Sequence, residues 1–152
     1  MSSTSAVISN NVPDAIPNQP ERCVIILNEA LPAGKAVNAA AVIALTVGQR
    51  HPMLVGAPLI DADNMEYPGL IPIGIPVLSA PAQTLNALSD RCRQQGLDRV
   101  IFPLEGQATT DYAGFCQAVR ALPSGEIQLL GIAIIGNKKA VRKLTARCAL
   151  FG

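Results

Sequence analysis

The sequence has very few aromatic residues and a single histidine. It contains no Trp, two Tyr, three Phe and one His among 152 residues. So few rings leave little surface for stacking nucleic-acid bases. One histidine, with no Cys-x-x-Cys pair, argues against a zinc site of the usual composition. We therefore expect no metal and no cofactor, and we expect free thiols in a reducing compartment at all four cysteines: Cys23, Cys92, Cys116 and Cys148.

Long apolar runs are also missing, although apolar residues are abundant. No run reaches the roughly 18 to 20 residues that cross a bilayer. The first residues lack the basic start and apolar stretch of a secretory signal. We therefore expect a cytoplasmic protein that does not enter a membrane. Hydrophobic residues make up 49% of the chain and charged residues 15%, which is enough apolar material for a packed core.

The chain divides into two parts by composition. Residues 1–20 are rich in Ser, Asn and Pro, which predicts a flexible N-terminal arm. The alternative is that this arm docks on the body or on a partner through its few apolar side chains. Residues 21–152 are expected to form a single α/β domain.

The net charge is only +1, but the charges are unevenly placed. All 11 acidic residues lie at or before Glu126, whereas five basic residues and no acid follow it. Two pairs of these cations are spaced one helical turn apart and share a face. Such a stripe fits contact with phosphates, and it equally fits a solvated helix face. The five residues are Lys138, Lys139, Arg142, Lys143 and Arg147.

The secondary-structure pattern begins with a buried strand and an Ala-rich helix. The run CVIILN, residues 23–28, is apolar and β-branched, as in a central strand. The next helix is expected from Gly34 to Val47, where Gly48 would end it. Its lack of charge after the first turn predicts close packing on a sheet. Residues 71–78 predict an edge strand, because proline cannot donate to a ladder.

The remaining segments continue the alternation of strands and helices. They are a strand at 58–62, a turn at DADN, a helix at 79–96 capped by Ser79, a strand at 98–106, a helix at 109–122 capped by Thr109 or Thr110, a strand at 126–136 and a final helix capped by Asn137. This order predicts a three-layer α/β sandwich, a mixed β-sheet with helices on both faces.

The loop that joins the first strand to the first helix carries the main candidate residue, Lys35. Ligands bind in crevices beyond the strand ends of open α/β sheets. A lysine there fits holding a phosphate or stabilising charge on an ester. The alternative is a solvated lysine at a helix start, where the dipole slightly disfavours it. Asn28, at the strand end, and Asn38, in the first helical turn, are candidate ligand-binding residues, although Asn38 also fits a local backbone contact.

A second polar group follows another predicted strand. Thr109, Thr110 and Asp111 precede a helix and are expected to face the Lys35 crevice as ligand-binding residues. The alternative is ordinary capping of that helix. Asp61 and Asp63 resemble a carboxylate pair, but the later ligands of a calcium loop are missing, so a hairpin turn is expected there.

Two segments together resemble a known fold family. CVIILNEALPAGKAVNAAAVIAL resembles the first strand, loop and helix of type 2 peptidyl-tRNA hydrolases, and LLGIAIIGNKKAVRKLTARCALFG resembles their last strand and helix. The closer resemblance is to a bacterial sister group, a domain family of unknown function (number 2000). Its members share the NAAA helix start, the LIDAD segment and the LGIAIIGNKK ending. The resemblance covers roughly Arg22 to Phe151.

This resemblance implies a type 2 peptidyl-tRNA hydrolase-like fold with most of the reactive residues replaced. Lys35 matches the first Lys of the hydrolases' Gly-Lys-Gly-Lys loop, and Val37 stands at the second. Their Gln and His become Ala41 and Ala44 in the ungapped register, or Ala39 and Val42 in a register shifted by two residues. Their acidic loop before the last strand is also missing. Only Lys35 carries over as a candidate catalytic residue.

The resulting expectation is a protein without authentic peptidyl-tRNA hydrolase activity that binds a small anionic ligand in the Lys35 crevice. The alternative is a hydrolase cleaving the ester of peptidyl-tRNA or of a related acylated nucleotide. The near-neutral charge gives tRNA little support as a partner. A homodimer is expected, formed through the Ala-rich helix and the Pro-rich edge segments.

Overall fold

A computed structural model describes residues 19–152 of the chain. Most of the expected N-terminal arm lies outside the described residues, and its flexibility stays a prediction. The strands are β1 (Arg22–Asn28), β2 (Leu59–Ile60), β3 (Glu66–Tyr67), β4 (Val77–Ala80), β5 (Asp98–Pro103), β6 (Leu129–Gly136) and β7 (Ala149–Leu150). The helices are α2 (Ala33–Arg50), α3 (Ala82–Gln95), α4 (Glu105–Ala108), α5 (Tyr112–Arg120) and α6 (Lys138–Leu144), with short 3-10 turns at Pro52–Leu54 and Ser124–Glu126.

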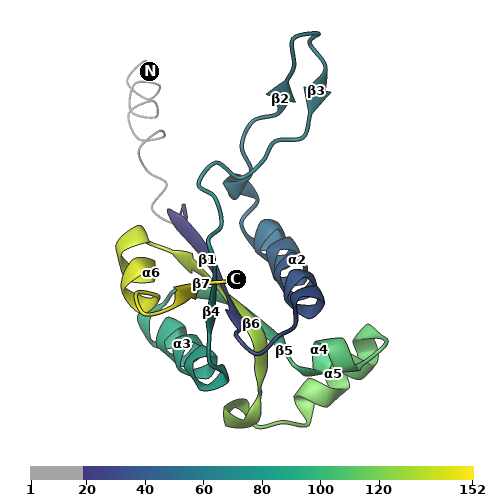
Figure 1. Ribbon diagram of the computed structural model, residues 1–152, viewed down its shortest axis with the longest axis vertical. Helices are drawn as coiled ribbons and strands as arrows, with labels where there is room; N and C mark the ends of the chain where they lie inside the picture. Colours follow the sequence, from purple (N-terminus) through teal and green to yellow (C-terminus); the bar gives the residue numbers. More distant parts are fainter. Residues whose placement is uncertain (1–18) are drawn as a thin grey trace, which may run out of the picture.

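Five strands form one mixed sheet between two helical layers. The strand order is β5-β6-β1-β4-β7, with β1 and β4 parallel and the other pairs antiparallel. Helix α2 covers one face, and α3 and α6 cover the other (Figure 1). Strands β2 and β3 form a separate hairpin that projects from the body beyond the C-terminal end of α2. The predicted α/β sandwich is therefore confirmed.

The central strands β1 and β6 are buried on both faces because nearly every residue in them is apolar. Along β1, Ile25 and Leu27 pack with α2, while Val24 and Ile26 pack with α3 and α6. Side chains of a strand alternate between its two faces, so a continuous apolar run needs cover on both. The expected strand at residues 23–28 is confirmed, and Arg22 extends it by one residue.

Helix α2 packs closely on the sheet through small side chains. Ala36 and Ala39 are fully buried against β1 and β6, with Ile43 one turn further along. Gly131 of β6 lies directly beneath this contact, and a Cβ there would come within 2.8 Å of the Leu27 side chain and 3.0 Å of Ile43. The expected close packing of this helix is confirmed for its inner face.

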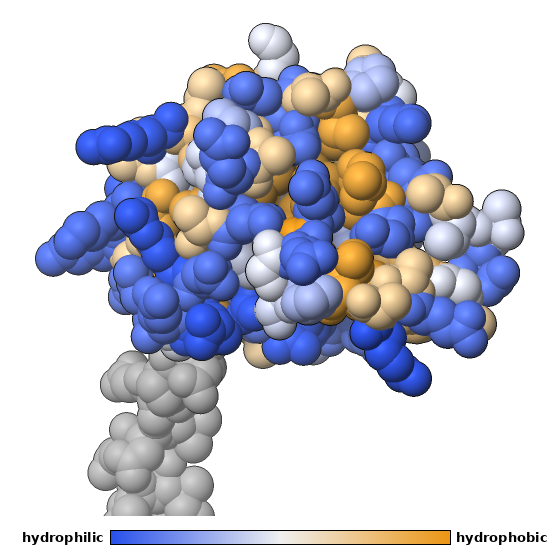
Figure 2. Space-filling view, turned by 90° about the horizontal axis from the view of Figure 1, so that it is seen from below, coloured by the Kyte–Doolittle hydropathy of each residue, from blue (hydrophilic) through white to orange (hydrophobic). Residues whose placement is uncertain are grey.

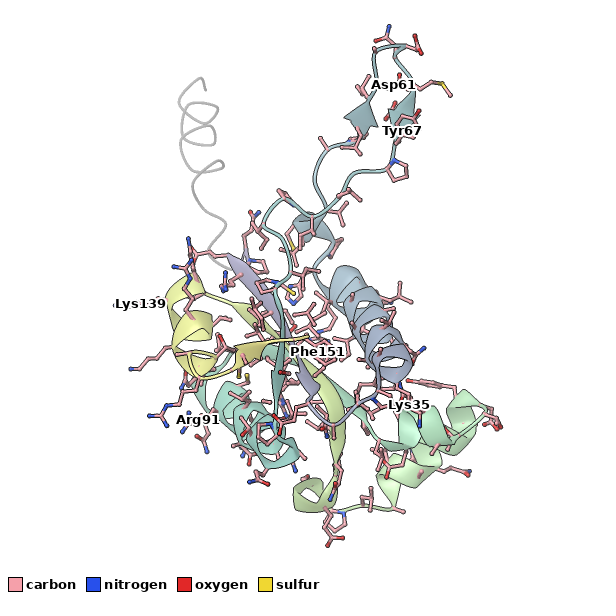
Figure 3. All side chains as sticks on the ribbon, viewed as in Figure 1. Lys35, Asp61, Tyr67, Arg91, Lys139 and Phe151 are labelled. Carbon is pink, nitrogen blue, oxygen red and sulfur yellow. The ribbon has the colours of Figure 1, made fainter. Side chains whose placement is uncertain are left out.

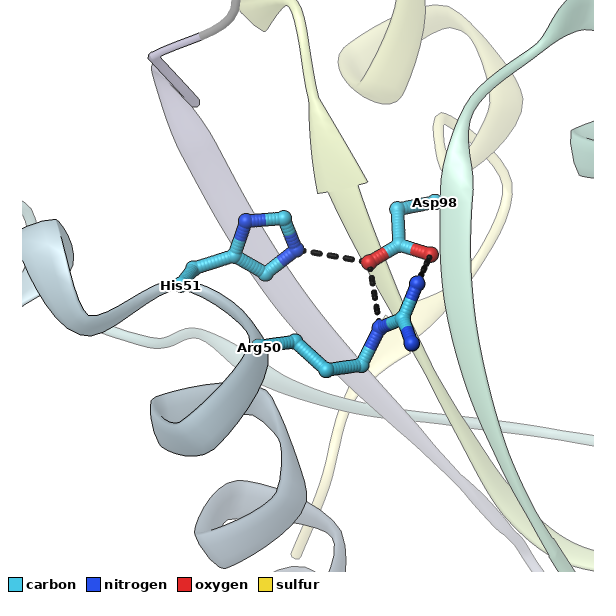
Figure 4. Close-up of polar contacts among 3 residues, drawn as sticks. All are labelled: Arg50, His51 and Asp98. Carbon is cyan, nitrogen blue, oxygen red and sulfur yellow. Dashed lines mark hydrogen bonds and ion pairs between the residues drawn. The ribbon is translucent and has the colours of Figure 1, made fainter.

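The C-terminal end of α2 is tied to the start of β5 by three charged or polar side chains (Figure 4). The Arg50 guanidinium donates two hydrogen bonds to the Asp98 carboxylate, at 2.8 and 2.9 Å. His51 Nε2 lies 2.6 Å from the same carboxylate. Burial acts to raise the pKa of Asp98, but the bonds from Arg50 and His51 outweigh it and lower that pKa below its ordinary value. This cluster fixes α2 at the point where the projecting hairpin begins.

At three of the predicted boundaries that are wrong, the element begins or ends beside a proline. Helix α2 continues through Gly48 to Arg50, because the residue before Pro52 is the first that disfavours the helical region. The segment 71–78 is not an edge strand, since β4 begins only after Pro76 and β7 pairs with its outer side. Ser79 lies within β4, and α3 begins after Pro81 with no side-chain cap.

The cap of α5 and three short elements, α4, β3 and β7, differ from what the sequence pattern indicated. Asp111, rather than Thr109 or Thr110, caps α5, its carboxylate accepting a hydrogen bond from Gly114 N at 2.6 Å. Residues 105 and 106, expected to end a strand, instead begin the single turn α4. β3 and β7 have two residues each, which is too short for a visible alternation of apolar side chains.

We expect Asp98→Asn to lower the free energy of unfolding at neutral pH by about 1–3 kcal/mol, because two charge-assisted contacts are lost. The folded pKa of Asp98 lies below its ordinary value of 3.8. Its stabilising effect is therefore complete above that value and is lost as the pH falls through the folded pKa. Urea unfolding of both proteins between neutral and acidic pH measures this difference. Asp90→Asn, an exposed change on α3, is the control, and a difference that stays constant down to the most acidic pH would contradict the expectation.

Candidate functional site

The predicted residues Lys35 and Asn38 lie together at the exposed start of α2, where α4 contacts them. Gln107 Nε2 donates to the Lys35 carbonyl oxygen and to Asn38 Oδ1, both at 3.0 Å. The contact to Lys35 thus uses its backbone, and within residues 19–152 its ammonium group forms no ion pair. The structure therefore brings Lys35 beside Asn38 but gives it no acidic partner in the described chain.

The other predicted residues make local contacts. Asn28 Oδ1 accepts a hydrogen bond from Ala30 N at 3.0 Å, which holds the loop after β1, and its amide donates to the Leu129 carbonyl at the start of β6 at 3.4 Å. Thr109 Oγ1 donates to the Glu105 carbonyl at 2.9 Å, closing α4. Asp111 caps α5, and Thr110 is exposed beside it. No hydrogen bond among the described residues links these side chains to Lys35.

Helix α4 places two buried acceptor oxygens near the start of α2. Glu105 Oε1 and Gln107 Oε1 are buried and have no hydrogen-bond partner. Acceptor oxygens favour a donor group and repel an anion. The surroundings of Lys35 are therefore less favourable to an anionic ligand than the sequence alone indicated, because α4 was not expected there.

A large cavity lined by described residues lies on the opposite face of the sheet. It is a solvent-open groove of about 1280 Å³ between α3 and α6, and Lys35 does not line it. In Figure 3, Arg91 and Lys139 lie on the same side of the molecule, and Lys35 lies across the sheet from them. Leu88 and Leu144 form part of its apolar lining.

Four cations from two helical segments converge on this groove. Arg91 comes from α3, Lys139 and Lys143 from α6, and Arg147 from the turn that follows α6. Figure 2 shows hydrophilic side chains projecting on the side of the molecule where α3 and α6 lie. Cations gathered in one groove raise the local concentration of anions. The arrangement therefore suits an anionic ligand.

The packing of the two helices explains why these cations face the groove. Leu85, Leu88 and Cys92 bury one side of α3, which leaves Arg91 beside the groove. Val141 and Leu144 bury one side of α6. Lys139 and Lys143, one turn apart, then line the groove.

The other pair of cations on α6 occupies a neighbouring surface. Lys138 and Arg142 line a smaller cavity with Glu21. Glu21 Oε1 accepts a hydrogen bond from Lys138 N at 2.9 Å, and Asn137 caps the helix as expected. The start of α6 is therefore already occupied by protein groups. Lys139 borders both cavities, whereas Lys143 lines the groove alone and Lys138 and Arg142 line the smaller cavity alone.

The chemical character of the groove follows from its lining residues. Glu29 is the one acid among the lining residues, and no aromatic residue and no histidine lines the groove. The thiol of Cys148 lies at its edge, and burial raises the pKa of that thiol. No group of three or more metal-binding side chains occurs among residues 19–152. The described groove therefore holds neither a thiolate–histidine pair nor a metal site.

Three of the four cations that line this groove were identified from the sequence. The cations after Glu126 were noted, including the shared face of Lys139 and Lys143. Arg91 was missed because it belongs to another helix, and the sequence does not say which helices share a face of the sheet. The amphipathic pattern of α3, with apolar residues at 85, 88 and 92, was the available signal for the outward direction of Arg91.

Comparisons with known proteins agree with the fold and give no activity. A family model described as a protein of unknown function (DUF2000) matches residues 21–151. The solved structure of a protein of unknown function from Agrobacterium tumefaciens strain C58 is similar, with 20% sequence identity and a TM-score of 0.79. The match covers 86% of this chain and 97% of that chain, and at this identity it establishes the fold alone. No curated protein matches the chain.

We expect two of the four thiols to be alkylated in the folded protein. Cys23 and Cys92 are fully buried, and burial raises the pKa of each to about 11. Cys116 and Cys148 are half-buried. Thiolate is the reactive form, so Cys148 should react slowly at neutral pH and faster as the pH rises. Mass spectrometry after maleimide treatment, with and without urea, measures this order, and native labelling of Cys92 would contradict it.

Proposed function

The chain belongs to this family of unknown function, and we propose that it binds a small phosphorylated ligand in the groove between α3 and α6. The observation that carries the proposal is the convergence of Arg91, Lys139, Lys143 and Arg147 on one cavity that contains a single acid. A binding protein of this kind needs no catalytic group, in agreement with the lack of histidine among the residues that line the groove.

A ligand with several linked phosphates fits these side chains best. Arginine forms paired hydrogen bonds with phosphate oxygens, and lysine acts as a compact point charge. Cations on both walls favour an anion that spans the groove rather than a single small ion. Because no aromatic side chain lines the groove, a nucleobase would find no stacking surface there. Recognition would then rest on the phosphates.

The groove is a better place for the expected anionic ligand than the start of α2. At the groove the ligand meets four cations and one acid. At Lys35 it meets one cation and the neighbouring helix α4, which carries two buried acceptor oxygens without partners. Coulomb attraction therefore favours the groove.

The homodimer expected from the sequence forms part of this proposal. The groove and α2 lie on opposite faces of the sheet (Figure 1). Pairing through α2 would therefore leave both grooves open to solvent. A cytoplasmic location and a bacterial source remain predictions. Among residues 19–152, no helix is long and apolar enough to cross a membrane.

The second candidate function is ester hydrolysis at Lys35 on peptidyl-tRNA or a related acylated nucleotide. Its support is the position of Lys35 in a strand-to-helix loop and the resemblance of that loop to type 2 peptidyl-tRNA hydrolases. A lysine alone stabilises negative charge but does not activate water. The only histidine, His51, is held by Asp98 at the far end of α2. We therefore rank hydrolysis second.

We expect tripolyphosphate to bind the wild-type protein and the double variant Lys143→Ala/Arg147→Ala to bind it about tenfold more weakly or worse, because charge-assisted contacts are worth about 1.5–3 kcal/mol each. Titration calorimetry at low salt measures both affinities. Lys138→Ala/Arg142→Ala is the matched control, since it removes the same charge from the neighbouring surface of the same helix. Equal losses in the two double variants would overturn the proposal in favour of non-specific attraction.

The same titration identifies the class of ligand. ATP should bind about as tightly as tripolyphosphate, because the groove offers no surface for the base. The logarithm of the affinity should fall only gently with the logarithm of the salt concentration, in proportion to the few phosphates contacted. A steep salt dependence with tight binding of tRNA would instead show a nucleic-acid surface and contradict the small-ligand proposal.

We expect the purified protein not to cleave peptidyl-tRNA faster than the background rate. The assay is run beside Lys35→Ala, and a known peptidyl-tRNA hydrolase serves as the positive control. Cleavage by the wild type that disappears in Lys35→Ala would establish the second candidate function and displace the first. Cleavage that survives in the variant would contradict both the binding proposal and the role of Lys35.

A further inference from the structure

The outer face of α2 is apolar and uncovered. Val37, Val42 and Leu45 are 70%, 40% and 79% exposed. Between Lys35 and Arg50 the helix carries no charged residue. A surface helix of a monomer usually presents charged residues to water on its outer face. This face of α2 has the composition of a contact surface.

The projecting hairpin is a second uncovered apolar feature. We call residues 56–70 the arm, which is a different segment from the N-terminal arm predicted for residues 1–20. Its strands pair over only two residues each, Leu59–Ile60 with Glu66–Tyr67. A two-stranded hairpin is marginally stable at best in water and normally packs on something. The apolar side chains exposed on the arm are Leu59, Ile60, Met65, Tyr67 and Leu70.

Specific contacts nonetheless hold the arm in one shape. At its tip, Asp61 Oδ1 accepts hydrogen bonds from Asp63 N at 2.8 Å and Met65 N at 2.9 Å, and Tyr67 donates its hydroxyl to Asp61 Oδ2 at 2.7 Å. The Tyr67 bond and the backbone bonds lower the pKa of Asp61. At its base, Gly56 N donates to the Leu70 carbonyl at 2.8 Å, and a Cβ on Gly69 would collide with the Gly56 backbone. Hydrogen bonds thus hold both the turn and the base of this apolar arm, which favours a defined contact with another surface.

We propose that the arm of one protomer packs on the outer face of α2 of a second copy of this chain, and that the second arm does the same in return. This inference rests on the homodimer of the proposed function and names its surface. A two-fold interface must be complementary to itself. The arm and α2 provide the two halves of such an interface. A stable pair of this kind needs roughly 800 Å² of contact per partner.

The charges of the two features complement each other. The arm contains three acids, Asp61, Asp63 and Glu66, and no basic residue. The start of α2 contains Lys35, no acid in its first turn, and the positive end of the helix dipole. A neighbouring acid and the dipole of a partner's helix would stabilise each other there.

The direction and length of the arm agree with this contact. The arm leaves the body beyond the C-terminal end of α2 (Figure 1), with Asp61 and Tyr67 far from Lys35 of the same chain (Figure 3). When two α2 helices lie antiparallel, each arm points toward the start of the partner's α2. α2 has 18 residues and is ~27 Å long. From Gly56 to the tip, the arm spans roughly 20–25 Å of extended chain.

Sedimentation of the full chain at micromolar concentration tests the inference. We expect a dimer for the wild type. Leu45→Glu on α2 and Ile60→Lys on the arm should each raise the dimer dissociation constant about tenfold or more, because each places a charge at the centre of the contact. Lysine at position 60 faces Glu66 across the hairpin, so the hairpin itself is not weakened by like charges. Leu150→Lys, at a 76% exposed site on β7, is the control and should remain a dimer.

A charge exchange tests the proposed orientation. Lys35→Glu and Asp63→Lys should each weaken the dimer, and the double variant should restore much of the loss, because the pair is rebuilt with opposite signs. Glutamate at the start of α2 interacts favourably with the helix dipole, so Lys35→Glu is not expected to destabilise that helix. A wild type that is monomeric would overturn the homodimer of the proposed function as well. A dimer that survives Leu45→Glu and Ile60→Lys would overturn the arm contact alone, and phosphate binding in the groove is measured independently of both.

Discussion

The antiparallel pair of β1 and β6 is the constraint on which the rest of the structure depends. Both strands are apolar along nearly their whole length, so water must be excluded from both faces of the sheet centre. One face is closed by a single long helix with small side chains. The other is closed by two shorter helices, α3 and α6, set beside each other. Within residues 19–152, the large groove lies on the second face, where α3 and α6 meet side by side above the sheet.

The same division separates two kinds of surface. Close packing on Gly131 draws α2 down onto the sheet and turns the opposite side of that helix, with Val37 and Leu45, to the outside. On the other face, burial of Leu88 and Leu144 turns the cations of α3 and α6 outward. An apolar surface and a basic groove therefore come from one cause, the need to cover both sides of two central strands. They do not compete for space, because the sheet lies between them.

The sequence was sufficient to predict the elements whose residues bury themselves in a regular pattern. Residues 23–28 and the run before Asn137 were recognisable as central strands, and the Ala-rich helix was recognisable from its composition. The prolines indicated where regular structure stops. They did not indicate which strand lies at the edge of the sheet, because that depends on β7, the last strand in the chain. The role of Thr109 was misread for a similar reason: the unexpected turn α4 changed which residue begins α5. The groove brings Arg91 together with residues about fifty positions further along the chain, and no local sequence pattern contains such information.

The cluster of Arg50, His51 and Asp98 has a consequence for the projecting hairpin. It fixes the last turn of α2 to the first residue of β5, and the chain turns into the hairpin only a few residues later. The hairpin is long compared with this anchored region. A slight rotation of the chain about the Arg50–Asp98 ion pair would therefore produce a much larger displacement at the tip of the hairpin. The position of Asp61 and its neighbours at the hairpin tip thus depends on three polar side chains that lie far from the tip.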